Sequence, residues 1–267
     1  MKQISTYISF SIALLFIILV CLLYFNMKVT NKTLSQQTQM DTSFNLPANE
    51  SPEEPRFPIP VAAYNKIERP ELIAIPALGE SDQYLYLALS GIFDEVVMRL
   101  LTKTILIEKI VATIDNLPRQ HIAERMRPIS ARENSFIVET QLGVNNFILS
   151  ARSYDRYNSL IDNLSMIDAN ELANIYLRFY PLFQEAYEDL GYPQVYFNDR
   201  VIDVIDHLLS APEVNDPIIL HRPHVLYEFI HPELEALSSG QKLLIRLGVR
   251  NSAKVKQFLI DFKTLIS

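Results

Sequence analysis

Cysteine is almost absent from this chain, and its scarcity limits the available chemistry. The single cysteine, Cys21, lies inside a hydrophobic segment, so the rest of the chain carries no thiol. Disulfides, Cys-ligated zinc and a cysteine nucleophile are therefore excluded from the soluble part. A cysteine-free domain suits an oxidising compartment such as a periplasm, although many cytosolic domains also lack cysteine.

An excess of basic residues is also lacking. The 267 residues include 24 Lys and Arg against 31 Asp and Glu, which gives a net charge of −7 at pH 7. Neutralising the phosphates of a nucleic acid needs a clear excess of Lys and Arg, so we expect no nucleic-acid partner. Hydrophobic residues make up 49% of the chain, enough for a well-buried core, which excludes disorder throughout.

Charged residues are missing from positions 3–27, and residues 8–25 are almost continuously apolar. As a helix, residues 8–25 would span ~27 Å, close to the hydrocarbon thickness of a bilayer. Bulky residues end the run and Val20 precedes Cys21, so neither a signal-peptidase site nor a lipoprotein site is present. We therefore expect residues 1–27 to be an uncleaved, single-pass inner-membrane anchor. With so few residues before the span, we expect the C-terminal domain to lie in the periplasm.

Residues 28–77 lack apolar periodicity and are rich in proline. Proline fixes its own φ angle and disfavours the helical region for the residue before it. The pattern predicts a disordered, extended tether, partly in the polyproline II conformation. Residues 55–58 (Pro-Arg-Phe-Pro) form a P-x-x-P sequence, so this stretch is alternatively a peptide ligand for a partner.

Residues 78–267 carry the periodicities of a mainly α-helical domain with a small β-hairpin. The hairpin is expected from residues 135–140 and 145–150, and a short extended segment from 217–227. Helices are expected from Ser81 or Asp82 onward and over about 105–116, 153–161, 168–190 with a kink at Pro181, 195–209, 232–247 and 252–266.

Several stretches in a fixed order carry a family resemblance. They are residues 113–119 (TIDNLPR), 180–187 (YPLFQEAY), 190–193 (LGYP), 197–200 (FNDR), 206–209 (DHLL), 226–229 (LYEF), 232–237 (PELEAL) and 239–242 (SGQK). The chain resembles the DUF3014 family of proteobacterial proteins over about residues 78–265. The resemblance implies a bacterial, membrane-tethered protein, and it brings no established active site from which catalytic residues could be transferred.

The most suggestive polar cluster follows residue 198. Arg200, Asp203 and His207 share one helical face at i, i+3 and i+7, and Asp199 lies nearby. A carboxylate beside a histidine can orient it as a general base. The chain has no G-x-S-x-G turn to supply a nucleophile, so the favoured interpretation is a capped helix start with a structural Arg–Asp pair. Asp199, Asp203 and His207 remain the candidate catalytic residues.

Three further patterns have a structural and a functional interpretation. His221, His224 and His231 fit no standard zinc spacing, so we expect no metal site there, and we expect no cofactor. The aromatic residues between Tyr176 and Tyr187 are spaced either as a sugar-stacking platform or, as we favour, as a buried helix face.

A basic loop is the best candidate for a partner surface. Arg119, Arg125 and Arg127 lie close together and could bind an anionic glycan, a lipid headgroup or an acidic protein. Arg200 is a further candidate binding residue. Glu124 and Glu133 dilute the positive charge and the domain is acidic elsewhere, so pairing with acidic helices of the same domain is the default interpretation.

The leading hypothesis is a membrane-tethered, non-enzymatic interaction or scaffolding domain of the bacterial cell envelope with a protein partner. The alternative is an envelope hydrolase or glycan-processing enzyme that uses the Asp199, Asp203 and His207 cluster. A ligand-sensing domain that signals through another chain is a third hypothesis.

Overall fold

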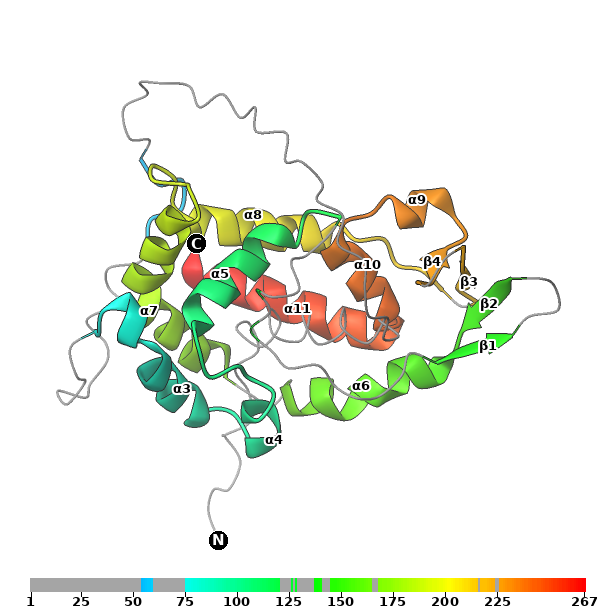
Figure 1. The fold of residues 1–267 in the computed structure, drawn as a ribbon, viewed down its shortest axis with the longest axis horizontal. Helices are drawn as coiled ribbons and strands as arrows, with labels where there is room; N and C mark the ends of the chain where they lie inside the picture. Colours follow the sequence, from blue (N-terminus) through cyan, green and yellow to red (C-terminus); the bar gives the residue numbers. More distant parts are fainter. Residues whose placement is uncertain are drawn as a thin grey trace, which may run out of the picture.

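A computed structural model describes residues 54–59, 75–120, 126, 128, 137–140, 145–164, 168–215, 217–223 and 226–267. The described domain is mainly helical with a small antiparallel sheet, as the sequence predicts (Figure 1). In chain order its elements are η1 (Leu78–Glu80), α3 (Asp82–Ser90), α4 (Glu95–Met98), α5 (Leu106–Asn116), β1 (Val138–Thr140), β2 (Asn146–Leu149), α6 (Ala151–Leu164), α7 (Ala169–Asp189), α8 (Phe197–Leu209), β3 (Ile219–His221), β4 (Glu228–Phe229), α9 (Pro232–Glu235), α10 (Ser239–Arg246) and α11 (Val249–Ile266).

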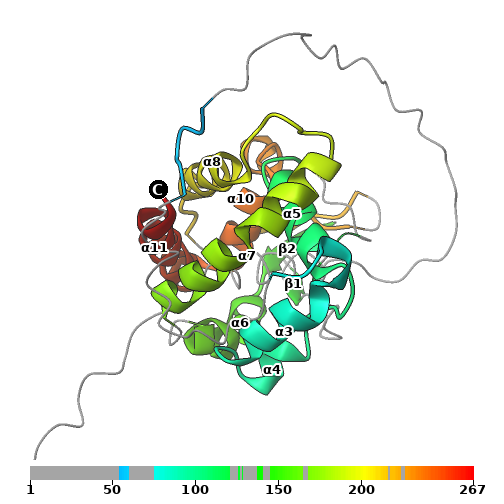
Figure 2. The same ribbon diagram turned by 90° about the vertical axis from the view of Figure 1, so that its left-hand side faces the viewer.

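Helices α5, α7, α8 and α11 form the centre of the domain. Both α7 and α8 contact α5 on one side and α11 on the other (Figures 1 and 2). Apolar residues recur along α7 every three or four positions, so one side of this helix is buried in the main core. Its inward-facing residues are at most 5% exposed and include Leu172, Tyr176, Phe179, Phe183 and Tyr187. The aromatic stripe is therefore part of the core.

The sheet lies at one end of the molecule, beside α9 and α10 (Figure 1). Among the described residues, four strands pair antiparallel in the order β1-β2-β3-β4. The predicted hairpin is confirmed as β1 and β2, with Val138 opposite Leu149. The predicted extended segment contains β3, whereas β4 was missed because it spans only two residues. Leu149, Leu220 and Phe229 form a second, smaller core with Ile245 of α10.

The helix predicted over residues 232–247 is wrong, because the chain forms α9 and α10 instead. Ser238 begins a new helix through a capping box: its hydroxyl accepts the Gln241 N–H, and the Gln241 side chain accepts the Ser238 N–H. The last helix begins at Val249, earlier than predicted, directly after Gly248 with its positive φ of 75°. Helix α7 continues through Pro181 as one element.

The predicted anchor, residues 1–27, lies outside the described residues. None of the helices that the structure describes is long and apolar enough to cross a membrane. Of the predicted tether, the described part includes residues 54–59, which lie against the domain beside α8 and the end of α11 (Figure 2). Phe57 and Ile59 pack on the main core. This stretch of the tether is therefore a part of the folded structure.

Candidate functional site

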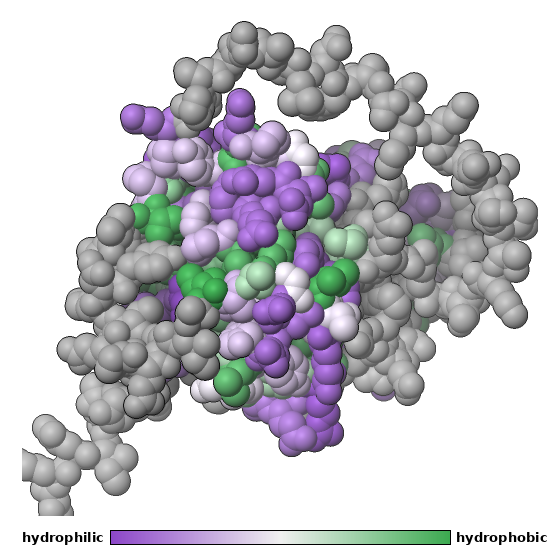
Figure 3. Space-filling view, turned by 60° about the vertical axis from the view of Figure 1, so that its left-hand side comes forward, coloured by the Kyte–Doolittle hydropathy of each residue, from purple (hydrophilic) through white to green (hydrophobic). Residues whose placement is uncertain are grey.

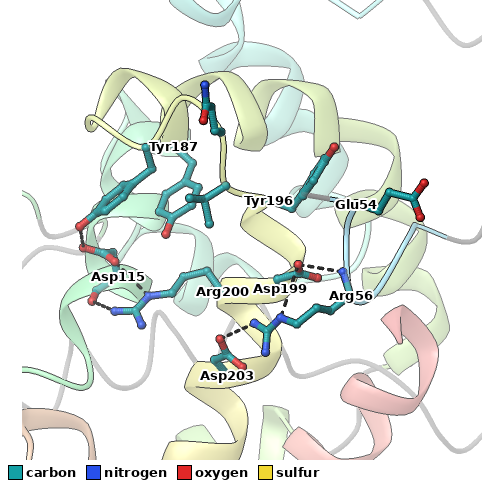
Figure 4. Close-up of a pocket in the computed structure, with 11 residues that line it drawn as sticks. Glu54, Arg56, Asp115, Tyr187, Tyr196, Asp199, Arg200 and Asp203 are labelled. Atoms are coloured by element: carbon teal, nitrogen blue, oxygen red, sulfur yellow. Dashed lines mark hydrogen bonds and ion pairs between the residues drawn. The ribbon is translucent and has the colours of Figure 1, made fainter. Parts of the chain in front are cut away.

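A polar cavity of about 470 Å³ lies where α5, α7 and α8 meet residues 54–59 (Figure 4). Its walls come from the C-terminal ends of α5 and α7, the loop that joins α7 to α8, and the first two turns of α8. The lining residues are Glu54, Arg56, Asp115, Tyr187, Tyr192, Gln194, Val195, Tyr196, Asp199, Arg200 and Asp203.

Gln184 sets the position of α8 relative to α7. Its side-chain oxygen accepts the N–H of Phe197 at 2.8 Å, and its side-chain nitrogen donates to the carbonyl of Val195 at 2.9 Å. The first N–H groups of a helix have no partner within the helix, and Tyr196 at the N-cap provides no side-chain hydrogen bond. Gln184 therefore supplies the missing partner and holds the start of α8 beside the cavity.

Asp115 is the centre of a buried charge network. Its carboxylate accepts hydrogen bonds from Arg119 at 2.7 Å and from the Nε of Arg200 at 2.9 Å. A second nitrogen of Arg200 donates to the Asp115 carbonyl at 2.7 Å. The Asp115 side chain is 6% exposed, whereas the side chain of Arg200 is 26% exposed. Arg200 thus links the end of α5 to α8 through charge-assisted hydrogen bonds.

Two stacked tyrosines form the wall beside this network. The rings of Tyr187 and Tyr192 are 4.6 Å apart and inclined by 22°. The Tyr192 hydroxyl accepts a hydrogen bond from Arg119 and lies 3.4 Å from the Asp115 carboxylate. Burial, followed by the charge of Asp115, raises the pKa of Tyr187 to about 12. Tyr187 therefore stays protonated at physiological pH and acts in the wall as an aromatic surface.

Asp199 holds the backbone of the docked segment. One carboxylate oxygen accepts the N–H of Arg56 at 3.0 Å, and the other accepts the N–H of Phe57 at 2.9 Å. The Nε of Arg56 lies 3.8 Å from the same carboxylate, which is largely buried. Backbone amides that donate to a carboxylate satisfy a charge that would otherwise be costly to bury.

Asn198 completes the backbone contacts from the neighbouring position of α8. Its side-chain nitrogen donates to the carbonyls of Phe57 at 2.9 Å and Ile266 at 2.8 Å. Its side-chain oxygen accepts the hydroxyl of Tyr176 at 3.0 Å. Asn198 is 1% exposed, so its orientation is fixed by the core on one side and by the docked segment on the other.

The exposure of the docked segment alternates from residue to residue, and its backbone bends at Arg56 and Phe57. Pro55, Phe57 and Ile59 are half-buried, whereas Glu54, Arg56 and Pro58 are exposed. The exposed Arg56 side chain reaches Asp203, with 2.6 Å between its terminal nitrogen and the carboxylate (Figure 4). The segment is thus recognised through its backbone, its apolar side chains and one guanidinium group.

The structure separates the candidate catalytic residues. Asp199 and Asp203 both line the cavity and both contact Arg56. His207 does not line the cavity: its ring nitrogen lies 2.8 Å from the hydroxyl of Ser238, at the start of α10. Burial, and then the charge of Arg200, lowers the pKa of His207. The histidine and the two carboxylates therefore do not meet around one space.

The structure describes two of the four candidate binding residues. Arg119 and Arg200 come together on Asp115, so the proposed pairing with an acidic helix holds for these two side chains. Arg125 and Arg127 lie outside the described residues. Of the histidines, His221 lies 3.5 Å from Glu228, and His231 lies 3.5 Å from Glu233. His224 also lies outside the described part of the chain.

Sequence reasoning missed Asp115 and Gln184. It expected Asn198 or Asp199 to cap the helix, which is wrong because Tyr196 is at the N-cap. Asp115 sits inside a helical pattern, where nothing marks it as the partner of Arg200. The P-x-x-P sequence around Arg56 was an alternative indication of a peptide ligand for a partner, whereas the structure shows this segment docked on its own chain.

A family model described as "Protein of unknown function (DUF3014)" matches residues 106–263, more than half of the chain. The chain belongs to this family. The matched region begins with α5 and ends within α11. It therefore contains every cavity-lining residue outside the docked segment, including Asp115 and Asp199. Residues 54–59 precede the DUF3014 region. No curated protein and no solved structure matches the chain.

Proposed function

We propose that the protein is a membrane-tethered, non-enzymatic interaction or scaffolding domain of the bacterial cell envelope. The observation that carries the proposal is the polar cavity, where residues 54–59 are held through their backbone. Asp199 accepts two successive N–H groups, and Asn198 donates to the next carbonyl. Domains that recognise peptides also hold their ligands through main-chain hydrogen bonds.

The carboxylates that line the cavity on α5 and α8 all bind groups of the same chain. Asp115 is paired with two arginines, Asp199 with backbone amides, and Asp203 with Arg56. A general acid or base must instead reach the proton of a substrate. The separation of His207 from these carboxylates further disfavours the envelope hydrolase or glycan-processing alternative.

An exposed apolar side chain lies at the mouth of the cavity. Val195 is 46% exposed and lines the cavity next to Tyr196. Elsewhere, on the face shown in Figure 3, hydrophilic and hydrophobic residues are interspersed. Exposed large apolar residues such as Leu87 and Ile260 come from separate helices. We therefore place the partner surface at the mouth of the cavity.

The membrane part of the proposal rests on the apolar residues 8–25 and has its own test. A reporter active only outside the cytoplasm is fused after residue 267 of the full chain. Activity would agree with an inner-membrane anchor and a periplasmic domain. A silent fusion, together with an active cytoplasmic reporter, would contradict the periplasmic location.

The interaction is tested by site-specific photo-crosslinking in the native cell. A photoreactive residue replaces Val195 at the cavity mouth, and a matched control replaces Ile260, which is also 46% exposed but does not line the cavity. We expect a discrete protein adduct from position 195 and none from position 260. Envelope-glycan cleavage that Asp203→Asn and His207→Gln both abolish would favour the enzymatic alternative instead.

A further inference from the structure

Residues 54–59 contact a face of α8 that is formed by Asn198, Asp199 and Asp203 and is called the receptor face below. Asn198 and Asp199 are nearly buried, and both direct polar atoms to the segment. Their contacts with the segment are to backbone groups of Arg56 and Phe57, where the chain bends, so they fix this bend and the register of the segment. This part of the recognition does not depend on the side chains of the ligand.

The side chains add a sequence preference. Asp203 pairs with the guanidinium of Arg56, and the main core receives Phe57 and Ile59. Pro58 follows without an N–H group, so no donor is left unpaired at that exposed position. The preferred ligand is therefore a peptide with an arginine, an aromatic residue and a proline in succession.

The docking is also weak enough to be reversible. The Arg56–Asp203 pair is exposed, with side chains that are 58% and 46% accessible, and exposed ion pairs contribute little. The apolar residues of the segment are only half-buried. Docking also costs conformational entropy, because it holds the segment in one conformation. This cost is similar in size to the free energy gained from the ion pair, the hydrogen bonds and the apolar contacts.

From these observations we infer that the face formed by Asn198, Asp199 and Asp203 is a binding site for an Arg-aromatic-Pro peptide that bends at its arginine and aromatic residue. Residues 54–59 occupy the site as an intramolecular ligand, and a partner peptide of the same chemistry displaces them. This inference rests on the proposed interaction function and names the class of partner. Because the occupying segment belongs to the same chain, its effective concentration is on the order of millimolar, so a partner must compete with it.

The test uses the full chain and a labelled peptide with the sequence of residues 52–61. In one variant, Arg56→Ser and Phe57→Ser together weaken the intramolecular ligand without touching the receptor face. We expect fluorescence polarisation to show at least ~10-fold tighter peptide binding to this variant than to the unaltered chain. A control peptide that carries the same two serines should bind neither protein. Equal binding to the variant and the unaltered chain would overturn the inference.

The receptor residues are tested in the emptied variant. Asp199→Asn places an amide nitrogen against the backbone N–H groups of the ligand, and we expect at least ~10-fold weaker binding. Should Asp199→Asn fail to fold, Asp203→Asn is the second variant, because Asp203 is exposed. Asp203→Asn should weaken the arginine peptide but leave unchanged a peptide in which glutamine replaces the arginine. Equal losses for both peptides would contradict the assigned contact.

Two other results are decisive. Dimers of the unaltered chain that dissociate in the Arg56→Ser, Phe57→Ser variant would show exchange of the segment between copies and overturn the intramolecular assignment. A peptide that fails to bind, together with a specific adduct at position 195, would overturn this inference and leave the proposed interaction function standing.

Discussion

At the scale of single residues, Asp115 shows how the cavity depends on one buried carboxylate. Replacing it by asparagine leaves Arg119 and Arg200 without their counter-charge. Hydrogen bonds to charged groups contribute on the order of 1.5–3 kcal/mol, so we expect Asp115→Asn to lower the free energy of unfolding by about 2–3 kcal/mol. Urea denaturation measures the change. The control is Asp206→Asn, which removes an exposed pair with Lys263 and should cost less than ~1 kcal/mol.

His207 gives the domain a pH-dependent contribution to stability. Burial and the charge of Arg200 lower its pKa below the ordinary value of 6.5, so the unfolded chain takes up a proton more readily than the folded one. The contribution is present above pH 6.5 and is lost as pH falls from 6.5 through the folded-state pKa. We expect His207→Gln to reduce the fall in Tm between pH 7.5 and 5.5. The same slope in His207→Gln and in the exposed control His231→Gln would contradict this assignment.

At the scale of elements, the break between α9 and α10 shows what helical periodicity alone cannot predict. Apolar spacing continues across residues 232–247, yet the capping box of Ser238 restarts the helix. We expect Ser238→Ala to cost about 1 kcal/mol of unfolding free energy, because the N–H of Gln241 loses its partner. Ser252→Ala, in the first turn of α11, is the control and should change stability by less than ~0.5 kcal/mol. Thermal denaturation distinguishes the two variants.

The packing of α10 on α8 depends on the absence of a side chain at Gly240. An added Cβ would lie 2.4 Å from a methyl group of Leu208 and 3.2 Å from the carbonyl of Leu117. We therefore expect Gly240→Ala to destabilise the domain by about 1–3 kcal/mol in denaturant titration. Gly79→Ala is the matched control, since no atom lies within 4 Å of its added Cβ. Equal stabilities of the two variants would contradict the close approach of the helices.

At the scale of the whole molecule, the sequence predicted the helices better than their contacts. The positions of α5, α7 and α8 follow from apolar periodicity and from punctuation at Gly191 and Leu117-Pro118. The pairing of Arg56 with Asp199 joins residues 143 positions apart, and no local pattern encodes it. A proline-rich stretch has the same sequence pattern whether it is free or docked, because its composition records no partner residue on α8. The candidate site could therefore be located on α8, but its ligand could not.

Docking of residues 54–59 should protect the chain from cleavage after Arg56. Helix α8 binds the N–H groups of Arg56 and Phe57 and the carbonyl of Phe57. A protease can therefore cleave the bond after Arg56 only after the segment has detached. We expect trypsin to cut the full chain after Arg56 about 10-fold or more faster in Asp199→Asn than in the unaltered protein, and only about two- to five-fold faster in Asp203→Asn, because the Arg56–Asp203 pair is exposed. Time-resolved mass spectrometry measures this rate. Asp206→Asn, outside the docking face, should leave it unchanged.

The docking of residues 54–59 also determines which contacts first bear a force applied along the chain. If residues 8–25 are fixed in a bilayer, tension along the chain reaches the docked segment before it reaches any described helix. The contacts of Asp199 and Asp203 with the docked segment then break first, while the hydrophobic core stays intact. Their release would lengthen the maximal reach of the domain from roughly 80 Å to roughly 150 Å. The distance at which the domain works would thus depend on whether a few hydrogen bonds at the start of α8 are made.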